Sequence, residues 1–298
     1  MKVRTSTTMT DTIAQLARYA LTTHILFFST TAAANQNSIQ VLYTENDPPY
    51  SFADGTRHPR GFTIDICRRV IASLTRKHRF TDEPFWTPDR EYSKTKTSGY
   101  STVLDCRVNR TASELGPINK DLAPYLITGL KAAGPANTSA TGITELTAAR
   151  IAVSRRSVAG AALSEMNSRA GLRFRLLPVE SHQYAARTVL EGKADALVVE
   201  DWAIAEILRD PEFSEKLRVF AHYIRIDVLT IELLKGTPQQ RALVSEVVAE
   251  VLAGGEIYSL FSAWFTAPNE IFNRGLGQSP STLNRSLWQT PRSLNARN

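Results

Sequence analysis

The sequence predicts an α/β fold, and two observations carry that prediction. Short apolar runs typical of buried strands alternate with stretches of helical periodicity, most regularly between residues 150 and 208. The chain has 298 residues, 43% hydrophobic and 21% charged, an ordinary composition for a globular protein with a sizeable core. Alternating strands and helices imply a parallel sheet with helices on both of its faces.

The first predicted strand, at 39–43, ends in a loop that carries aromatic side chains. Asn46-Asp47-Pro48-Pro49 stops the strand because each proline fixes φ and removes a donor. A helix is predicted to begin near Thr63. Tyr50 and Phe52 therefore lie in a loop at the carboxyl end of a strand, where open α/β sheets bind ligands.

The middle of the chain is harder to assign. Residues 80–99 predict a loop with one short strand, 102–106 a weak strand, and 106–120 a polar loop. Residues 125–130 predict a strand that leads into a linker at 132–142, rich in Ala, Gly, Ser and Thr. This change in composition marks the first crossing between domains.

The second half has the clearer pattern. Strands are predicted at 150–154, 174–179 and 194–199, and helices at 158–170, 183–190 and 201–208. Residues 219–234 predict extended chain that could cross back to the first domain. Thr237, Pro238 and Gln240 then predict a capped helix start. The tail, 269–298, has no periodicity and is predicted to be flexible.

Residues 1–34 resemble an export signal. Basic residues precede a mostly apolar stretch at 19–28, and Ala32-Ala33-Ala34 ends the segment as signal peptidase requires. The alternative is an amino-terminal extension that stays on the protein. We expect cleavage before Asn35 and a periplasmic location. No cysteine follows the cleavage site, so a lipid anchor there is not expected.

Two cysteines, Cys67 and Cys106, follow the signal. In an oxidising compartment they could form a disulfide, whereas Cys67 on the apolar face of its helix could also be a buried free thiol. The spacing alone does not choose between these alternatives.

Several function classes find no support. The net charge is +6, but lysine and arginine are scattered and no nucleic-acid-binding motif accompanies them. No two of the five histidines have metal-ligand spacing, and neither a nucleophile elbow nor a phosphate-binding glycine loop occurs. We therefore expect no nucleic acid, metal, cofactor or catalytic residue, and a protein that is not an enzyme.

Several motifs together resemble the periplasmic solute-binding proteins of amino-acid ABC importers. They are the PPYSF loop at 48–52, Gly61-Phe62 with Asp65, the run 191–196 that leads into Glu200, and Trp264-Phe265. His182 lies 18 residues before Glu200, a spacing similar to the glutamate/aspartate-binding branch of that family. The resemblance covers residues 39–265 and is moderately specific for the motifs taken together.

The resemblance implies a periplasmic-binding-protein-like fold of two lobes joined by two crossing strands. The first lobe would comprise 37–130 and 223–268, the second 131–222, and 269–298 would be the flexible tail. Each lobe would be a sheet flanked by helices, and the lobes would close over the ligand. The expected partners are a small polar, amino-acid-like solute and the membrane permease of an ABC importer, with the protein itself a monomer.

The resemblance also implies ligand-binding residues. Glu200 would pair with the ligand ammonium, with Asp201 beside it, although either acid could instead cap the following helix. His182 would help to hold the ligand side chain, or would lie exposed near a helix start. Ser157 matches a position where the family uses small hydroxyl residues.

One departure from the family pattern bears on the ligand. The family has Thr-x-x-Arg, whose arginine clamps the ligand carboxylate. Here Thr111 is followed by Ala112, Ser113 and Glu114, and no arginine occupies the clamping position. Arg110 or Arg107 could substitute for it, or could be a surface charge.

This departure argues against glutamate or aspartate as the ligand, and against any simple α-amino acid, and it leaves other functions open. The alternatives are an enzyme on the same scaffold, similar to cyclohexadienyl dehydratase with Glu200 as general acid, and an accessory or sensory protein with an altered pocket. An unrelated secreted α/β protein is the remaining alternative.

Overall fold

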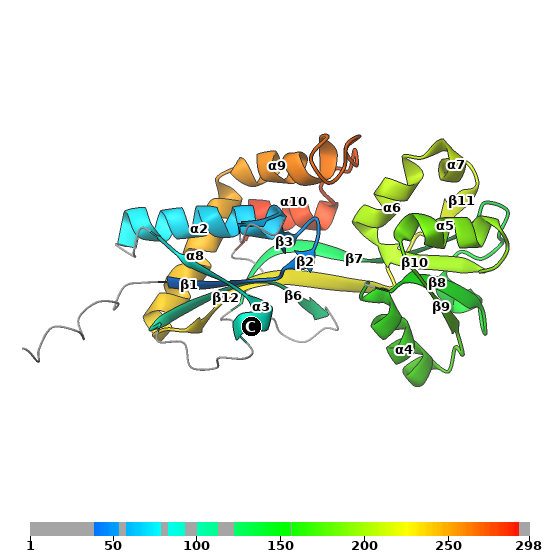
Figure 1. Cartoon of the computed structure of the whole chain (residues 1–298), viewed down its shortest axis with the longest axis horizontal. Coiled ribbons are helices and arrows are strands. Elements are labelled where there is room, and N and C mark those ends of the chain that lie inside the picture. Colours follow the sequence, from blue (N-terminus) through cyan, green and yellow to red (C-terminus); the bar gives the residue numbers. More distant parts are fainter. Residues whose placement is uncertain are drawn as a thin grey trace, which may run out of the picture. The chain divides into compact units, whose positions relative to one another are not determined.

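The structure, a computed structural model, describes residues 39–53, 58–78, 83–92, 100–112, 122–155 and 157–291. The predicted signal peptide and residues 292–298 of the predicted tail lie outside the described residues. Within them the chain forms an α/β fold of two lobes joined by long crossing strands, as the sequence predicted (Figure 1). No helix in these ranges is long and apolar enough to cross a membrane.

The strands are β1 (Ile39–Tyr43), β2 (Asn46–Asp47), β3 (Ser51–Ala53), β4 (Pro59–Arg60), β5 (Phe85–Pro88), β6 (Thr102–Ala112), β7 (Ala123–Pro135), β8 (Arg150–Ser154), β9 (Arg175–Val179), β10 (Ala196–Glu200), β11 (Leu217–Val219) and β12 (Arg225–Lys235). The helices are α2 (Phe62–His78), α3 (Asp89–Tyr92), α4 (Ala159–Ala170), α5 (His182–Leu190), α6 (Asp201–Leu208), α7 (Pro211–Ser214), α8 (Pro238–Ala253), α9 (Glu256–Phe261) and α10 (Thr282–Gln289), with a 3-10 turn η1 (Ile143–Glu145) and a π-helical turn η2 (Ser262–Thr266).

One continuous sheet runs through both lobes in the order β5-β1-β6-β12-β7-β10-β8-β9, with β11 also paired to β7. The outer pairs in each lobe are parallel: β5-β1-β6 in the first and β10-β8-β9 in the second. The central pairs β6-β12, β12-β7 and β7-β10 are antiparallel. Figure 1 shows β7 and β12 passing from the group with α2 and α8 to the group with α4–α7.

Residue alternation explains why helices cover both faces of the second-lobe sheet. On β10, Leu197 and Val199 belong to the core cluster that contains residues of α5 and α6, whereas Ala196 and Val198 belong to the cluster that contains residues of α4. Successive strand residues point to opposite faces, so both faces are apolar and both are buried. The sequence of β10 is therefore one apolar run that ends at Glu200.

Two of the central strands, β6 and β7, are longer than the sequence predicted. β6 continues through the predicted polar loop to Ala112, because it pairs with β12 through Thr111 and Ala112. β7 continues through the start of the predicted linker to Pro135, where β10 and β11 pair with it. Tertiary pairing overrides the polar composition of the β6 segment and the loop-like composition of the β7 segment.

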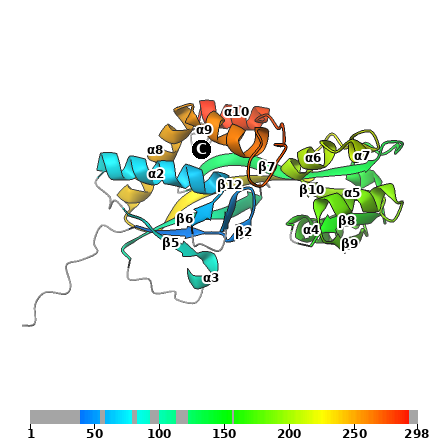
Figure 2. The ribbon, with the colours of Figure 1, turned by 45° about the horizontal axis from the view of Figure 1, so that its top comes forward.

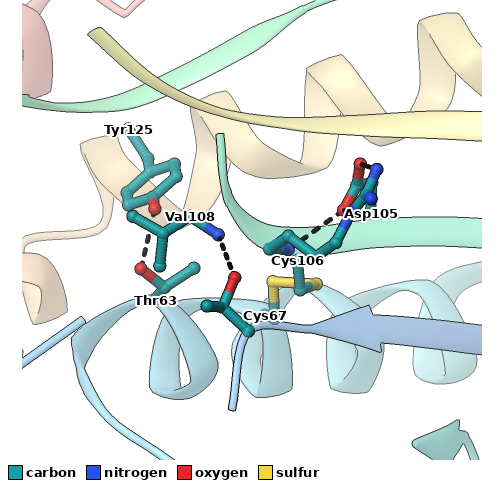
Figure 3. Close-up of a disulfide and its surroundings, with 8 residues drawn as sticks. Thr63, Cys67, Asp105, Cys106, Val108 and Tyr125 are labelled. Carbon is teal, nitrogen blue, oxygen red and sulfur yellow. Dashed lines mark hydrogen bonds and ion pairs between the residues drawn. A yellow bond between two sulfur atoms is a disulfide. The ribbon is translucent and has the colours of Figure 1, made fainter. Parts of the chain in front are cut away.

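A disulfide joins α2 to β6. The sulfur atoms of Cys67 and Cys106 are bonded, and both residues are fully buried in the main core cluster (Figure 3). Thr63 and Tyr125 hydrogen-bond beside this link, with 2.7 Å between their hydroxyl oxygens (Figure 3). Of the two alternatives that the sequence left open, the structure contains the disulfide.

The prediction of a flexible tail was wrong for residues 282–289, which form α10. Figure 2 shows this helix in the first lobe beside α9. Asn284 donates to the carbonyl of Ile127 and accepts from its N–H, at 2.8 and 2.7 Å. Trp288, 1% exposed, donates to the carbonyl of Tyr125. These bonds satisfy backbone groups of β7 that β10 does not reach, which orders the helix.

Candidate functional site

A proline loop places Tyr50 against the first helix. The N–H groups of Phe62 and Thr63 donate to the carbonyls of Pro49 and Tyr50, at 3.0 and 2.9 Å. Gly61 has φ +122°, and a Cβ there would lie 2.3 Å from the carbonyl oxygen of Tyr50. Only glycine permits this approach. The loop is thereby fixed with the Tyr50 side chain buried.

Arg110, on β6, is the centre of an ion-pair network. Its Nη1 lies 2.6 Å from Oδ2 of Asp47, and its Nη2 lies 2.8 Å from Oε1 of Glu200. The guanidinium also lies over the ring of Tyr50, 5.4 Å from its centroid. Burial opposes the charge on Arg110, but Glu200 and Asp47 more than offset that cost and raise the pKa of the guanidinium. The network joins first-lobe and second-lobe residues.

Glu200 ends β10 and is 6% exposed. Its side chain makes no capping bond to α6, so the helix-cap alternative does not hold for this residue. The carboxylate instead accepts from Arg110 and, at 3.1 Å, from the indole N–H of Trp202. Burial raises the pKa of Glu200 to about 7 despite the opposing effect of Arg110. The carboxyl is thus poised to change its charge near neutral pH.

Asp201 lies beside this network and is held by neutral donors. Its carboxylate accepts from the hydroxyl of Thr128 at 2.7 Å, from the N–H of Trp202 at 2.9 Å and from the hydroxyl of Tyr223 at 3.3 Å. The Thr128 hydroxyl also lies 3.0 Å from that of Tyr50. Burial raises the pKa of Asp201. Asp201 therefore links β7, α6 and the proline loop.

His182 is the first residue of α5, after the capping residue Ser181. Its ring meets Trp202 edge to face, 5.1 Å between centroids. Burial lowers the pKa of His182 to about 4, so the imidazole is neutral at pH 7. Its Nδ1 is buried and has no hydrogen-bond partner within the described part of the chain. Among the contacts of the described residues, His182 packs on Trp202, which in turn donates to Glu200.

The remaining candidates make other contacts. Phe52 packs edge to face on Trp264, 5.8 Å between centroids, and Trp264 donates to Asp65, which brings three of the resemblance motifs together. Ser157 donates to the carbonyl of Ser154 and accepts from the N–H of Ala159 (O–O and N–O distances 3.1 and 3.3 Å), as a local turn. Thr111 is exposed on β6. The described contacts thus unite Tyr50, Arg110, Glu200 and Asp201.

Sequence reasoning did not select four residues of this cluster: Asp47, Thr128, Trp202 and Tyr223. Asp47 stood in the quoted proline loop, and Trp202 two residues after Glu200, so proximity to selected residues was a usable signal. Thr128 and Tyr223 carried none, because their roles depend on how the crossing segments meet Asp201.

Comparison with solved structures establishes the fold. The chain is similar to a probable amino-acid ABC transporter extracellular-binding protein from Bacillus subtilis, with a TM-score of 0.54 and 14% identity, covering 76% of this chain and 97% of that one. A protein assigned as an L-cystine ABC transporter from Listeria monocytogenes gives 0.53 and 16%, covering 83% and 98%. An ancestral amino acid-binding protein, a precursor of cyclohexadienyl dehydratase, gives 0.51 and 17%, covering 76% and 95%.

Amino-acid-binding proteins of ABC transporters are therefore structural neighbours of this chain. At this low sequence identity, the structural likeness shows the fold alone and does not carry over the residues of a particular site. No protein-family model and no curated protein sequence matches the chain.

Proposed function

We propose that this chain is an extracytoplasmic solute-binding protein that captures a small polar, amino-acid-like solute and delivers it to the permease of an ABC importer. The fold and its structural neighbours support that class of protein. The observation that carries the proposal is the buried ion pair of Arg110 and Glu200, a cation from the first lobe and an anion from the second. A solute bound there would contact both lobes.

An α-amino acid has the charges needed to enter this ion pair. Its ammonium would replace the Arg110 guanidinium at Glu200, and the released Nη2 of Arg110 would bind its carboxylate. Asp47 would keep hold of Arg110 meanwhile. A simple acid would bind Arg110 but leave the Glu200 charge unpaired, which costs several kcal/mol. A simple amine would pair with Glu200 but leave Nη2 of Arg110 without the acceptor that it had in Glu200. A zwitterion would supply both partners, so Arg110 would be the clamp missing after Thr111.

Neighbouring groups would complete the site. Tyr50 presents a buried ring beside Arg110, and Asp201 a second carboxylate. His182, with its open Nδ1, would contact the solute side chain if Trp202 turned aside. Phe52, Thr111 and Ser157 would contact the ligand in a different conformation of the lobes.

The proposal includes export and closure. Cleavage of residues 1–34 would place the mature protein in the periplasm, as a monomer. The lobes, 37–130 with 223–268 and 131–222, would move about the crossing strands. Ligand entry would require such motion, because the Arg110 and Glu200 side chains are only 12% and 7% exposed.

Calorimetry with a screened solute tests the role of Glu200. Amino acids and organic acids are first screened by thermal shift, and binding of the best solute is then titrated. Glu200→Gln keeps the size of the side chain but removes its charge. We expect a loss on the order of 1.5–3 kcal/mol, roughly ten- to a hundredfold in affinity, because a charge-assisted hydrogen bond to the ammonium is lost.

Glu206→Gln is the matched control. Glu206 lies on α6, and burial raises its pKa too, but Glu206 is not one of the acids paired with Arg110. Its affinity should equal that of the wild type. Unchanged affinity in Glu200→Gln would remove Glu200 from the binding site.

One observation supports an enzyme as a second candidate function. A carboxyl with a pKa of about 7 can donate a proton at neutral pH, as a dehydratase requires of its general acid. The ancestral neighbour is itself described as a precursor of cyclohexadienyl dehydratase. In that case Glu200→Gln would keep binding but lose turnover of a cyclohexadienyl acid.

A further inference from the structure

The C-terminal chain makes a loop between η2 and α10. The hydroxyl of Thr266 donates to the carbonyl of Gln278 at 2.6 Å, and the N–H of Gln278 donates to the carbonyl of Phe265 at 2.9 Å. The N–H of Gly277 donates to the carbonyl of Thr266 at 3.1 Å. These bonds close the base of the loop, which we call the C-terminal loop (residues 267–277).

The C-terminal loop packs on the second lobe. Phe272 and Leu276 are 6% and 3% exposed and belong to the core cluster that contains Ile207 and Phe213 of α6 and α7. The ring of Phe272 lies 5.7 Å from that of Trp202, centroid to centroid. The C-terminal loop, which follows η2, therefore contacts α6, the helix that begins directly after Glu200.

Trp202 connects this contact to the ion-pair network. Phe272 and His182 both pack on its ring, and its indole N–H donates to Oε2 of Glu200 at 3.1 Å. Arg110 holds the other oxygen, Oε1. The orientation of the indole, which the two flanking rings set, therefore decides whether Oε2 has a donor.

We propose that Phe272 is a positioning residue for Glu200, acting through Trp202, so that the C-terminal loop supports the proposed binding site from behind Trp202. The role of Phe272 in solute binding rests on the proposed function. Removing the Phe272 ring would let the indole tilt and leave Oε2 without its donor. Glu200 would then depend on Arg110 alone, against the negative charges of Asp47 and Asp201.

The indole N–H signals of tryptophan in a nitrogen-15 NMR spectrum test this proposal without any ligand. The chain has four tryptophans, and Trp202→Phe identifies the signal of Trp202. In the wild type this signal should shift with pH as Glu200 titrates, with a midpoint near 7. The shift should vanish in Glu200→Gln.

Phe272→Ala should move the Trp202 signal toward that of a solvated indole and remove most of its shift with pH. Phe272→Leu, which keeps apolar volume, should restore much of both. Leu287→Ala truncates an equally buried residue of the C-terminal segment, 2% exposed but on α10, and should leave the Trp202 signal as in the wild type.

Two results would overturn the proposal: a Trp202 signal that titrates normally in Phe272→Ala, or one that Leu287→Ala disturbs as strongly. Because no solute enters the measurement, failure of the solute screen would count against the proposed function and leave this test intact.

Discussion

Arg110 and Arg107 illustrate what decides a role at the residue scale. The sequence left both open as a clamp, since both lie in a polar stretch that was predicted to be a loop. On a strand, residues three apart point to opposite faces. Arg107 accordingly pairs with the buried Asp105 at 2.6 Å, while Arg110 pairs with Asp47 and Glu200. The choice could not be made without knowing that β6 continues through both residues.

Glu200 makes folding stability depend on pH in a definite direction. Its pKa is about 7 in the folded protein and near the ordinary 4.5 when unfolded, so between these values the folded state holds more protons. The free energy of unfolding therefore falls as pH rises from about 4.5 to 7, by at most about 3 kcal/mol from this group. Thermal unfolding measured at intervals across that window tests this.

The comparison variant is Glu200→Gln, which cannot titrate. Other acids, including Asp201, also change with pH, so the informative quantity is the difference between the two proteins. That difference should grow in favour of the glutamine variant as pH rises. Parallel pH profiles would mean that Glu200 is already ionised throughout the window.

At the scale of elements, regular apolar patterns were predictable and polar strands were not. β8 and α6 have the predicted bounds, and the predicted capping box of Thr237 and Gln240 starts α8. These elements bury one or both faces, which leaves a periodic signal. β6 lies at the candidate site and has four charged or amide side chains from Asp105 to Arg110, so it lacks that periodic signal.

The disulfide fixes β6 to α2 and should contribute to stability. It closes a segment with a sequence separation of 39, for which chain entropy predicts about 4 kcal/mol, less any residual structure in the unfolded state. Urea unfolding of the Cys67→Ser, Cys106→Ser double variant should show a loss of this order. The wild type with reducing agent should resemble the variant.

The control is the double variant itself, whose unfolding midpoint should not change when the same reducing agent is added. If reducing agent leaves the unfolding midpoint of the wild type where it was, the two cysteines are not paired in the isolated protein.

The fold of the whole molecule was predictable from the motifs of the resemblance, and the structure brings these motifs into contact. Asp65 of the first motif accepts from Trp264 of the last at 2.8 Å, and Phe52 packs on the same indole. The C-terminal helix was not predictable in the same way. Its ordering depends on Asn284 and Trp288, whose partners lie 157 and 163 positions away.

Closure about the crossing strands is a prediction for the whole molecule. With the solute found by thermal shift, small-angle scattering should give a smaller radius of gyration than without it, because contacts to both lobes are made only when they approach. Glu200→Gln at the same solute concentration should show a smaller change. An identical radius with saturating solute would argue against hinge motion.

The side chain of Asn284 has a consequence for association between molecules. By bonding both the N–H and the carbonyl of Ile127, it acts as a one-residue substitute for a neighbouring strand. Beyond the reach of β10, the edge of β7 would otherwise offer these groups to the backbone of another chain, the first step of aggregation or domain swapping. A molecule that loses α10 to proteolysis would expose this edge of β7, so α10 would oppose association between molecules as well as stabilise the fold.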